Sequence, residues 1–153
     1  MINARSETVA VKPFFRDAFK KRRCLVPATG FYEWAKDGGE KRPIYFFRKD
    51  RAPFAIAGLW ESRPSAETGV ESFCLLTSAA NSFMKPYHHR MPVVLDAEHF
   101  EAWLDPSTDF TSLDSLLAPR PWDDMSAYPV SRRVNDPTND DPSCIEADAA
   151  GER

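Results

Sequence analysis

The sequence contains few cysteines, and none has the spacing of a metal site or of a disulfide framework. Only 3 of the 153 residues are cysteine, and no Cys-x-x-Cys pair occurs. This scarcity argues against a disulfide-rich fold and against structural zinc, and it favours a reducing compartment. We expect no metal and no cofactor.

Long apolar runs and internal repeats are also missing. No run approaches the length of a membrane span, and the first residues resemble neither a signal sequence nor a transit peptide. Hydrophobic residues make up 42% of the chain and Phe occurs 11 times, which is enough for one core. We expect a cytoplasmic monomer without a membrane partner, with a single domain over residues 1–134.

The net charge is only −3, but its distribution along the chain is uneven. Residues 1–51 hold 13 Lys or Arg against 6 Asp or Glu, and the remaining 102 residues hold 7 against 17. The basic first third is the candidate face for DNA. Its densest cluster, Lys20-Lys21-Arg22-Arg23, follows an expected helix and has two interpretations: it binds DNA, or it stabilises the negative end of the helix dipole.

Two segments carry candidate catalytic groups. Glu33 lies in the aromatic run Gly30-Phe31-Tyr32-Glu33-Trp34, a setting that suits a carboxyl group to proton transfer near neutral pH. His88 offers an imidazole, the side chain best suited to proton transfer at physiological pH, and Arg90 offers a fork of donors suited to phosphate. Alternatively, Glu33 faces solvent from a strand. His88 and His89 are adjacent, so at most one of them faces a given site.

Short segments rich in aromatic and β-branched residues predict strands, and few helical patterns separate them. This arrangement favours a mixed α+β fold with a mainly antiparallel, barrel-like sheet and short flanking helices. Residues 135–153 are expected to form an irregular or disordered tail. The predicted strands are 24–27, 31–34, 44–47, 54–59, 73–77, 93–95 and 126–131, and the predicted helices are 13–21, about 78–85, 96–104 and 113–117.

Four blocks in matching order resemble the SOS response-associated peptidase family, whose members recognise abasic sites in single-stranded DNA. The likeness spans nearly the whole chain. The blocks are Ile2-Asn3-Ala4-Arg5-Ser6-Glu7-Thr8, Arg23-Cys24-Leu25-Val26-Pro27-Ala28-Thr29-Gly30-Phe31-Tyr32-Glu33-Trp34, Leu76-Thr77-Ser78-Ala79-Ala80-Asn81 with His88-His89-Arg90-Met91-Pro92-Val93-Val94-Leu95, and Pro129-Val130-Ser131 with Val134-Asn135 and Asp140-Asp141-Pro142-Ser143.

The resemblance implies a fold of the expected kind and a role for each matched residue. It implies that Asn3 orients the reacting amine or sugar, that Glu33 moves protons at a Schiff base, and that His88 assists opening of the sugar ring. It also implies that single-stranded DNA is the partner and that self-processing peptidase activity accompanies DNA damage (SOS) repair. The implied DNA contacts are Arg5, Trp34, Thr77 and Arg90.

The start of the chain departs from the family pattern. Family members begin Met-Cys-Gly-Arg, and their Cys, once exposed, joins covalently to the abasic-site aldehyde through its amine and thiol. This chain begins Met1-Ile2-Asn3. The resemblance therefore implies a start at an internal methionine, without the segment that carries the nucleophile.

Three hypotheses stay open at this point. The first is a family enzyme that forms or processes a covalent link to abasic DNA. The second is a single-stranded-DNA-binding fragment, with weak abasic-site lyase activity through the Met1 amine. The third is a thiol protease that pairs Cys24 or Cys74 with His88. Both cysteines lie in apolar runs, where a thiol is expected to be buried with a raised pKa, whereas Cys144 is expected to be exposed.

Overall fold

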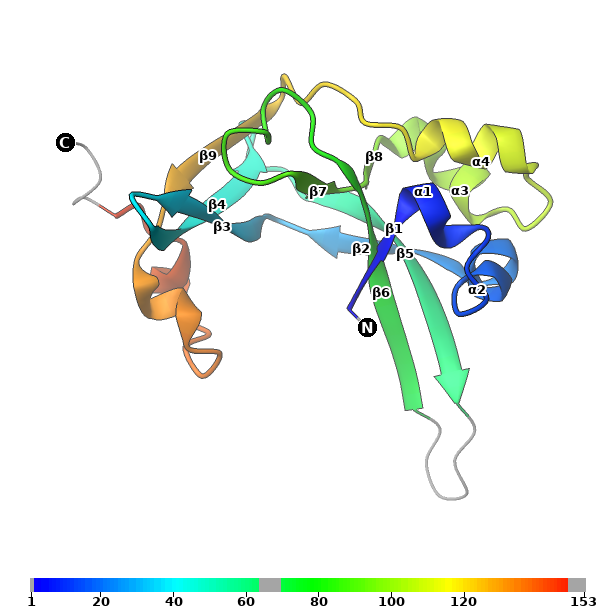
Figure 1. Ribbon diagram of the computed structural model, residues 1–153, viewed down its shortest axis with the longest axis horizontal. Coiled ribbons are helices and arrows are strands. Elements are labelled where there is room, and N and C mark those ends of the chain that lie inside the picture. Colours follow the sequence, from blue (N-terminus) through cyan, green and yellow to red (C-terminus); the bar gives the residue numbers. More distant parts are fainter. Residues whose placement is uncertain (1, 64–69, 149–153) are drawn as a thin grey trace.

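The fold is a curled, half-barrel sheet with a few short helices at one end, in agreement with the predicted α+β class (Figure 1). The structure is a computed structural model that describes residues 2–63 and 70–148. Its strands are β1 (Asn3–Arg5), β2 (Arg23–Ala28), β3 (Phe31–Asp37), β4 (Glu40–Arg48), β5 (Phe54–Arg63), β6 (Val70–Ala79), β7 (Arg90–Pro92), β8 (Val94–Leu95) and β9 (Met125–Pro129). Its helices are α1 (Ser6–Val9), α2 (Arg16–Lys21), α3 (Phe100–Leu104) and α4 (Phe110–Leu116), with 3-10 turns η1 (Ala97–His99), η2 (Arg132–Asn135) and η3 (Pro142–Ile145).

The strands form two sheets, and nearly all neighbouring strands are antiparallel. One sheet has the order β1-β6-β5-β2, with β7 on β6 and β8 on β5, and the other has the order β3-β4-β9. The exception is β1, which lies parallel to β6 with Asn3 opposite Leu75 and Arg5 opposite Thr77. None of the described helices has the length and apolar character that crossing a membrane requires.

The predicted helix after β6 is absent. Instead β6 continues through Ala79, and residues 82–87 form turns in which the Asn81 carbonyl accepts from Lys85 N–H at 3.0 Å. The Asn81 side chain accepts from Met84 N–H at 2.9 Å and donates to the Arg120 carbonyl at 2.8 Å. The bond to Met84 has the geometry of a helix N-cap, and the backbone bonds Asn81–Lys85 and Met84–His88 have helical spacing. The turns do not continue as a helix, because Pro86 has no N–H to donate and disfavours a helical residue before it.

The helices cover one end of the six-stranded sheet and bury a core between them. Trp103, with no exposed surface, packs in this core on Phe19 at a centroid distance of 6.1 Å. Arg23 is buried beside them, and its guanidinium donates to carbonyls at the ends of two helices. Arg23 thus caps helix ends from a buried position, where it cannot contact DNA, and the DNA-binding interpretation stays a prediction for Lys20 and Lys21. The accepting carbonyls are those of Phe19, Lys20, Trp103 and Asp105.

A second core joins the two sheets around Phe46 on β4. Phe46 has no exposed surface and stacks on Phe31 of β3, with ring centroids 5.0 Å apart. Tyr87, from the segment that leads to β7, meets the Phe46 ring edge-on at 5.1 Å. This cluster thus fixes β3 relative to the segment that carries His88.

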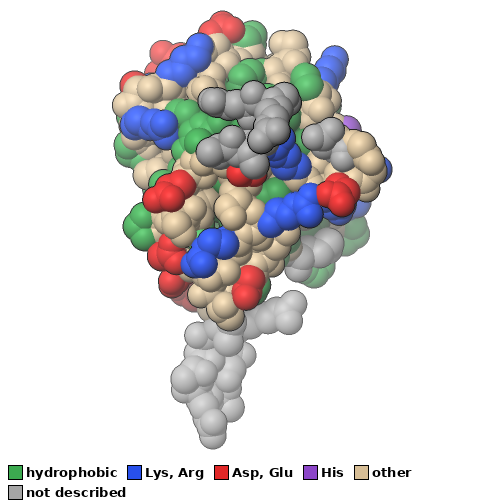
Figure 2. All heavy atoms as spheres, turned by 90° about the vertical axis from the view of Figure 1, so that its left-hand side faces the viewer, with side chains coloured by type: hydrophobic (Ala, Val, Ile, Leu, Met, Phe, Trp, Pro, Cys, Tyr) green, Lys and Arg blue, Asp and Glu red, His purple; other side chains and the backbone are tan. Residues whose placement is uncertain are grey.

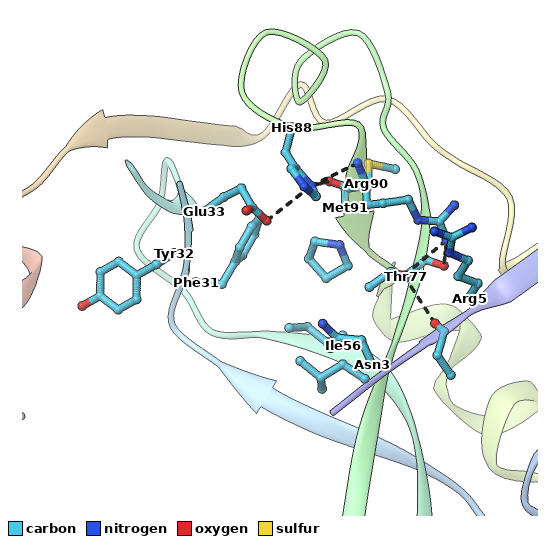
Figure 3. A pocket seen from close by; sticks show the side chains of 13 residues that line it. Asn3, Arg5, Phe31, Tyr32, Glu33, Ile56, Thr77, His88, Arg90 and Met91 are labelled. Carbon is cyan, nitrogen blue, oxygen red and sulfur yellow. Dashed lines mark hydrogen bonds and ion pairs between the residues drawn. The ribbon is translucent and has the colours of Figure 1, made fainter. Parts of the chain in front are cut away.

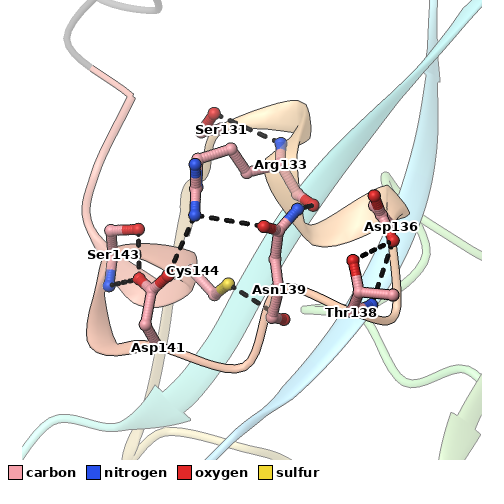
Figure 4. A network of polar contacts seen from close by, with 8 residues as sticks. All are labelled: Ser131, Arg133, Asp136, Thr138, Asn139, Asp141, Ser143 and Cys144. Atoms are coloured by element: carbon pink, nitrogen blue, oxygen red, sulfur yellow. Dashed lines mark hydrogen bonds and ion pairs between the residues drawn. The ribbon is translucent and has the colours of Figure 1, made fainter.

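The C-terminal segment folds back on the sheet of β3, β4 and β9, and polar contacts within the segment fix its shape (Figure 4). Arg133 donates to Asp141 at 2.9 Å and to Asn139 at 3.1 Å, and Asp141 accepts from the backbone N–H of Ser143. Cys144 is only 5% exposed, so the prediction that it is exposed was wrong. Its carbonyl accepts from the Tyr32 hydroxyl at 3.2 Å, so the segment is anchored to the sheet.

Acidic and basic side chains alternate on the face that carries this segment (Figure 2). Arg132 binds Glu40, and Arg133 binds Asp141. Cations of the first third of the chain are also partly neutralised by carboxylates from later in the sequence. Arg22 pairs with Glu61, Arg42 with Asp148 and Arg48 with Asp124.

Candidate active site

A pocket of about 340 Å³ lies between β1, β3, β6 and β7 and holds six of the seven residues that the sequence singled out (Figure 3). The seventh, Trp34, lines a neighbouring cleft. The walls of the 340 Å³ pocket are partly apolar and include Phe31, Ile56, Leu75 and Met91. The six are Asn3, Arg5, Glu33, Thr77, His88 and Arg90.

The alternation of β1 directs Asn3 and Arg5 into the pocket. Ala4 between them is 2% exposed and packs in the helix-covered core, whereas Asn3 and Arg5 are exposed. Successive side chains of a strand point to opposite faces, so burial of Ala4 places its two neighbours on the pocket side. Among the described residues, the Arg5 side chain forms no direct ion pair or hydrogen bond, although its charge helps to lower the pKa of the nearby Glu7 carboxyl. It is therefore a cation available to a ligand.

Glu33 and His88 face each other on one side of the pocket, as Figure 3 shows. The carboxylate oxygen of Glu33 lies 3.6 Å from His88 Nδ1, and the two side chains are 26% and 32% exposed. The other Glu33 oxygen accepts from the backbone N–H of Trp34 at 3.2 Å. A carboxylate and an imidazole at this distance attract each other when the imidazole is protonated, which suits proton exchange.

The Nδ1 atom of His88 lies beside one backbone donor and one backbone acceptor, both from Arg90. The Arg90 backbone N–H lies 3.2 Å from Nδ1, and the Arg90 carbonyl lies 3.1 Å from the same atom. A neutral Nδ1 accepts from the N–H, and a protonated Nδ1 donates to the carbonyl. The backbone of Arg90 thus accommodates both protonation states, as a group that gains and loses a proton requires.

Arg90 already has an anionic partner, which the sequence did not reveal. Its guanidinium donates to both carboxylate oxygens of Glu7, at 2.5 and 2.9 Å, and to the Thr77 carbonyl at 2.5 Å. The Arg90 side chain is 16% exposed and that of Glu7 is 49% exposed. The two lie 83 residues apart in the sequence, so only the membership of Glu7 in a matched block pointed to it.

The ion pair predicts a pH-dependent contribution to stability. The hydrogen bond from Arg90 holds the pKa of the Glu7 carboxyl below its ordinary value of 4.5. We expect Glu7→Gln to lower the free energy of unfolding by up to about 1 kcal/mol near neutral pH, because the carboxylate is half exposed. Because the pKa of Glu7 is lowered in the folded state, the ion pair contributes its full stability above pH 4.5. This contribution is lost as the pH falls through the lowered pKa.

Urea unfolding at several pH values measures this effect. The difference between wild type and Glu7→Gln should shrink on acidification, whereas the exposed control Glu101→Gln should show little difference throughout. A loss in Glu7→Gln that does not change with pH would contradict an ionic contribution.

The cysteines lie outside the pocket. Burial raises the pKa of the Cys24 and Cys74 thiols, as expected for cysteines in apolar runs. Cys74 is buried, and neither residue is among those that line the pocket with His88. The structure therefore gives the thiol protease hypothesis no nucleophile beside the imidazole.

The family model for the SOS response associated peptidase (SRAP) matches residues 1–137. The chain belongs to this family. The Bacillus subtilis abasic site processing protein YoqW is 43% identical over 150 residues, which cover 96% of this chain and 67% of that relative. The abasic site processing protein HMCES of Xenopus tropicalis is 32% identical over 167 residues, which cover 95% of this chain and 49% of that protein.

Solved structures agree with this assignment. A crystal structure of a Bacteroides thetaiotaomicron protein superposes with a TM-score of 0.88 at 33% identity, over 95% of this chain and 65% of that one. The chain thus spans about two thirds of the length of the Bacteroides protein and of YoqW, and about half of the length of HMCES. The SRAP fold and the pocket geometry are the basis for assigning a function.

Proposed function

We propose that this chain acts on abasic sites in single-stranded DNA and that the pocket receives the base-free sugar. The observation that carries the proposal is the meeting of Glu33 and His88, 3.6 Å apart, with Asn3 and the unpaired Arg5 in one pocket. At about 340 Å³ the pocket is near the lower end of the usual range for ligand sites, which suits one sugar-phosphate unit. The names of the relatives support the same substrate.

The first chemical step is opening of the sugar. An abasic deoxyribose is mainly a closed hemiacetal, and it opens when the C1 hydroxyl loses a proton and the ring oxygen gains one. His88 performs this exchange, since its Nδ1 has partners for both protonation states. The product is an aldehyde in the pocket beside Glu33.

The second step is capture of the aldehyde by an amine. The amine adds to the carbonyl carbon, and Glu33 protonates the departing hydroxyl, so that water leaves and a Schiff base forms. The amide of Asn3 orients the amine or the sugar. In the family pattern the amine belongs to an N-terminal Cys, whose thiol then adds to the imine carbon while its proton passes to nitrogen, which closes a thiazolidine ring.

We assign the covalent product and self-processing to a form that carries the family's Met-Cys-Gly-Arg segment ahead of these residues. Removal of the leader methionine frees the Cys amine, which accounts for the peptidase in the family name. In the sequence as given, the pocket holds the groups for sugar binding and ring opening. The expected covalent intermediate is then a Schiff base between the sugar aldehyde and the α-amine of Met1, a residue outside the described part of the chain, and borohydride would trap it.

Phosphate contacts bring the strand to the pocket. Arg5 makes the first of them, because Arg90 is already bound to Glu7 and acts from a fixed position beside Thr77. Such contacts release counterions, so the affinity falls as the salt concentration rises.

Fluorescence anisotropy tests the proposal with abasic and intact oligonucleotides, each single-stranded and duplex. We expect tightest binding to the abasic single strand and a salt slope that Arg5→Ala reduces by about 0.7. Arg16→Ala, on the exposed surface of α2, is the matched control. Equal binding to duplex and single strand, or binding that salt does not change, would overturn the assignment.

A further inference from the structure

A second hollow beside the pocket carries cations that the chemistry above does not use. This lysine cleft has a volume of about 500 Å³ and lies between the hairpin of β3 and β4 and the segment that leads to β7. It shares Glu33 and His88 with the pocket, so the candidate proton-transfer pair forms a common wall. The residues particular to the cleft include Trp34, Lys36, Lys41, Lys85, Tyr87 and His89.

The three lysines are unneutralised within the described part of the chain. All are exposed, and none forms an ion pair with a described side chain. Lys36 and Lys41 lie directly opposite each other in the β3–β4 register, where like charges destabilise a hairpin. Elsewhere on β4, Glu40 is held by Arg132. An anion in the cleft would relieve this repulsion.

The cleft also contains an aromatic ring held in place. The Trp34 indole N–H donates to the side-chain oxygen of Asn135 at 2.7 Å, although the two residues are 101 positions apart in the sequence. A fixed aromatic ring beside spaced cations is the combination that binds single-stranded nucleic acid, by stacking on bases and by attraction of phosphates. An acidic peptide offers charge but no base to stack.

The direction of the cleft follows from the pocket. Figure 3 shows Arg5 at the side of the pocket opposite Glu33 and His88, and these two residues border the lysine cleft. A strand held by Arg5 and reacting beside Glu33 therefore leaves the pocket toward the three lysines. Cations lie on both sides of the reacting sugar.

We propose that the lysine cleft binds the nucleotides that flank the abasic site on one side, with Lys36, Lys41 and Lys85 on the phosphates and Trp34 on a base. This inference rests on the proposed function and extends it from the reacting sugar to the neighbouring strand. The lysines contribute binding energy and do not take part in the reaction. Their contribution is confined to one flank because the cleft lies on one side of the pocket.

The experiment compares the triple variant Lys36→Gln, Lys41→Gln, Lys85→Gln with a control that removes the same charge elsewhere. The control is Lys12→Gln, Arg16→Gln, Lys49→Gln, whose side chains are exposed, line neither the pocket nor the cleft and lie outside the Lys20–Arg23 cluster. Both are measured by anisotropy over a range of salt with three single strands, which carry nucleotides 5′ of the abasic site, 3′ of it, or on both sides. Unfolding curves verify that both variants are folded.

We expect the salt slope of the cleft variant to fall by about 2 and its affinity at low salt to fall at least about tenfold. These losses should occur with the two-sided strand and with one of the one-sided strands, but not with the other one-sided strand. The control variant should keep the wild-type slope. Equal losses in both variants, equal losses with both one-sided strands, or full competition by polyglutamate would overturn the cleft assignment while leaving abasic-site binding intact. Absence of salt-dependent binding by the wild type would overturn the proposed function and this inference with it.

Discussion

Replacing Glu33 with Gln is expected to slow capture of an abasic single strand by about 100-fold, the usual scale for loss of a general acid or base. The amide would preserve the shape of the side chain and its acceptor for the Trp34 N–H, but it cannot donate a proton to the departing hydroxyl. Binding should change little. Glu101→Gln, which removes an exposed carboxyl group of α3, is the matched control.

Replacing His88 with Ala should have an effect of the same size for a different reason. The variant removes the ring that exchanges protons with the sugar and leaves Glu33 without its partner at 3.6 Å. His99→Ala provides the control, since His99 lies in η1 and does not line the pocket. Because the two groups serve successive steps through one pair, the double variant should lose less than the product of the single losses.

Capture is measured as the rate at which a shifted band appears on a denaturing gel. Two formats are used: the present chain with borohydride, and a chain extended by the family's Met-Cys-Gly-Arg segment without reductant. Wild-type rates in both single variants would remove Glu33 and His88 from the proposed chemistry. A stable adduct of the present chain without borohydride would instead implicate one of its thiols.

Replacing Phe46 with Ala should lower the free energy of unfolding by about 3–5 kcal/mol, the usual cost of emptying a fully buried aromatic position. Phe46 has no exposed surface and contacts Phe31 at 5.0 Å and Tyr87 at 5.1 Å. Phe31 precedes Glu33 by two positions, and Tyr87 precedes His88 by one. The ring thus supports both sides of the candidate site.

Urea unfolding followed by tryptophan fluorescence measures this loss. Phe46→Leu, which refills most of the space, should cost clearly less, and its capture rate should stay near that of the wild type. A comparison with Phe110→Ala, whose side chain is 57% exposed, separates burial from aromatic content. A cost below about 1 kcal/mol for Phe46→Ala would show that the core around β4 does not fix the two segments.

Sequence patterns located most of the sheet but not the end of β6. The aromatic and β-branched runs around Phe31, Ile44 and Phe54 became β3, β4 and β5. The helix expected after Ser78 did not form, because Ser78 and Ala79 pair with β7 and Pro86 stops the turns that follow. Local composition does not reveal how far a strand pairs with a distant segment.

The glycine of the aromatic motif gives a similar lesson. Gly30 has no positive φ, so its role is not conformational. A Cβ at this position would overlap the Tyr45 ring, because β4 brings that ring against the turn before β3. The motif was visible in the sequence, but the space it protects exists only after the hairpin has formed.

The sequence by itself determined the family, the fold class and the identity of the candidate groups, because motifs and strand patterns are local properties of the chain. Tertiary structure alone decided their relationships. It brought Glu7 onto Arg90 over 83 positions, left Arg5 without an ion partner among the described residues, and buried Arg23 and Cys144. Charge neutralisation and burial depend on which distant segments meet, and strand pairing rather than sequence proximity sets those meetings.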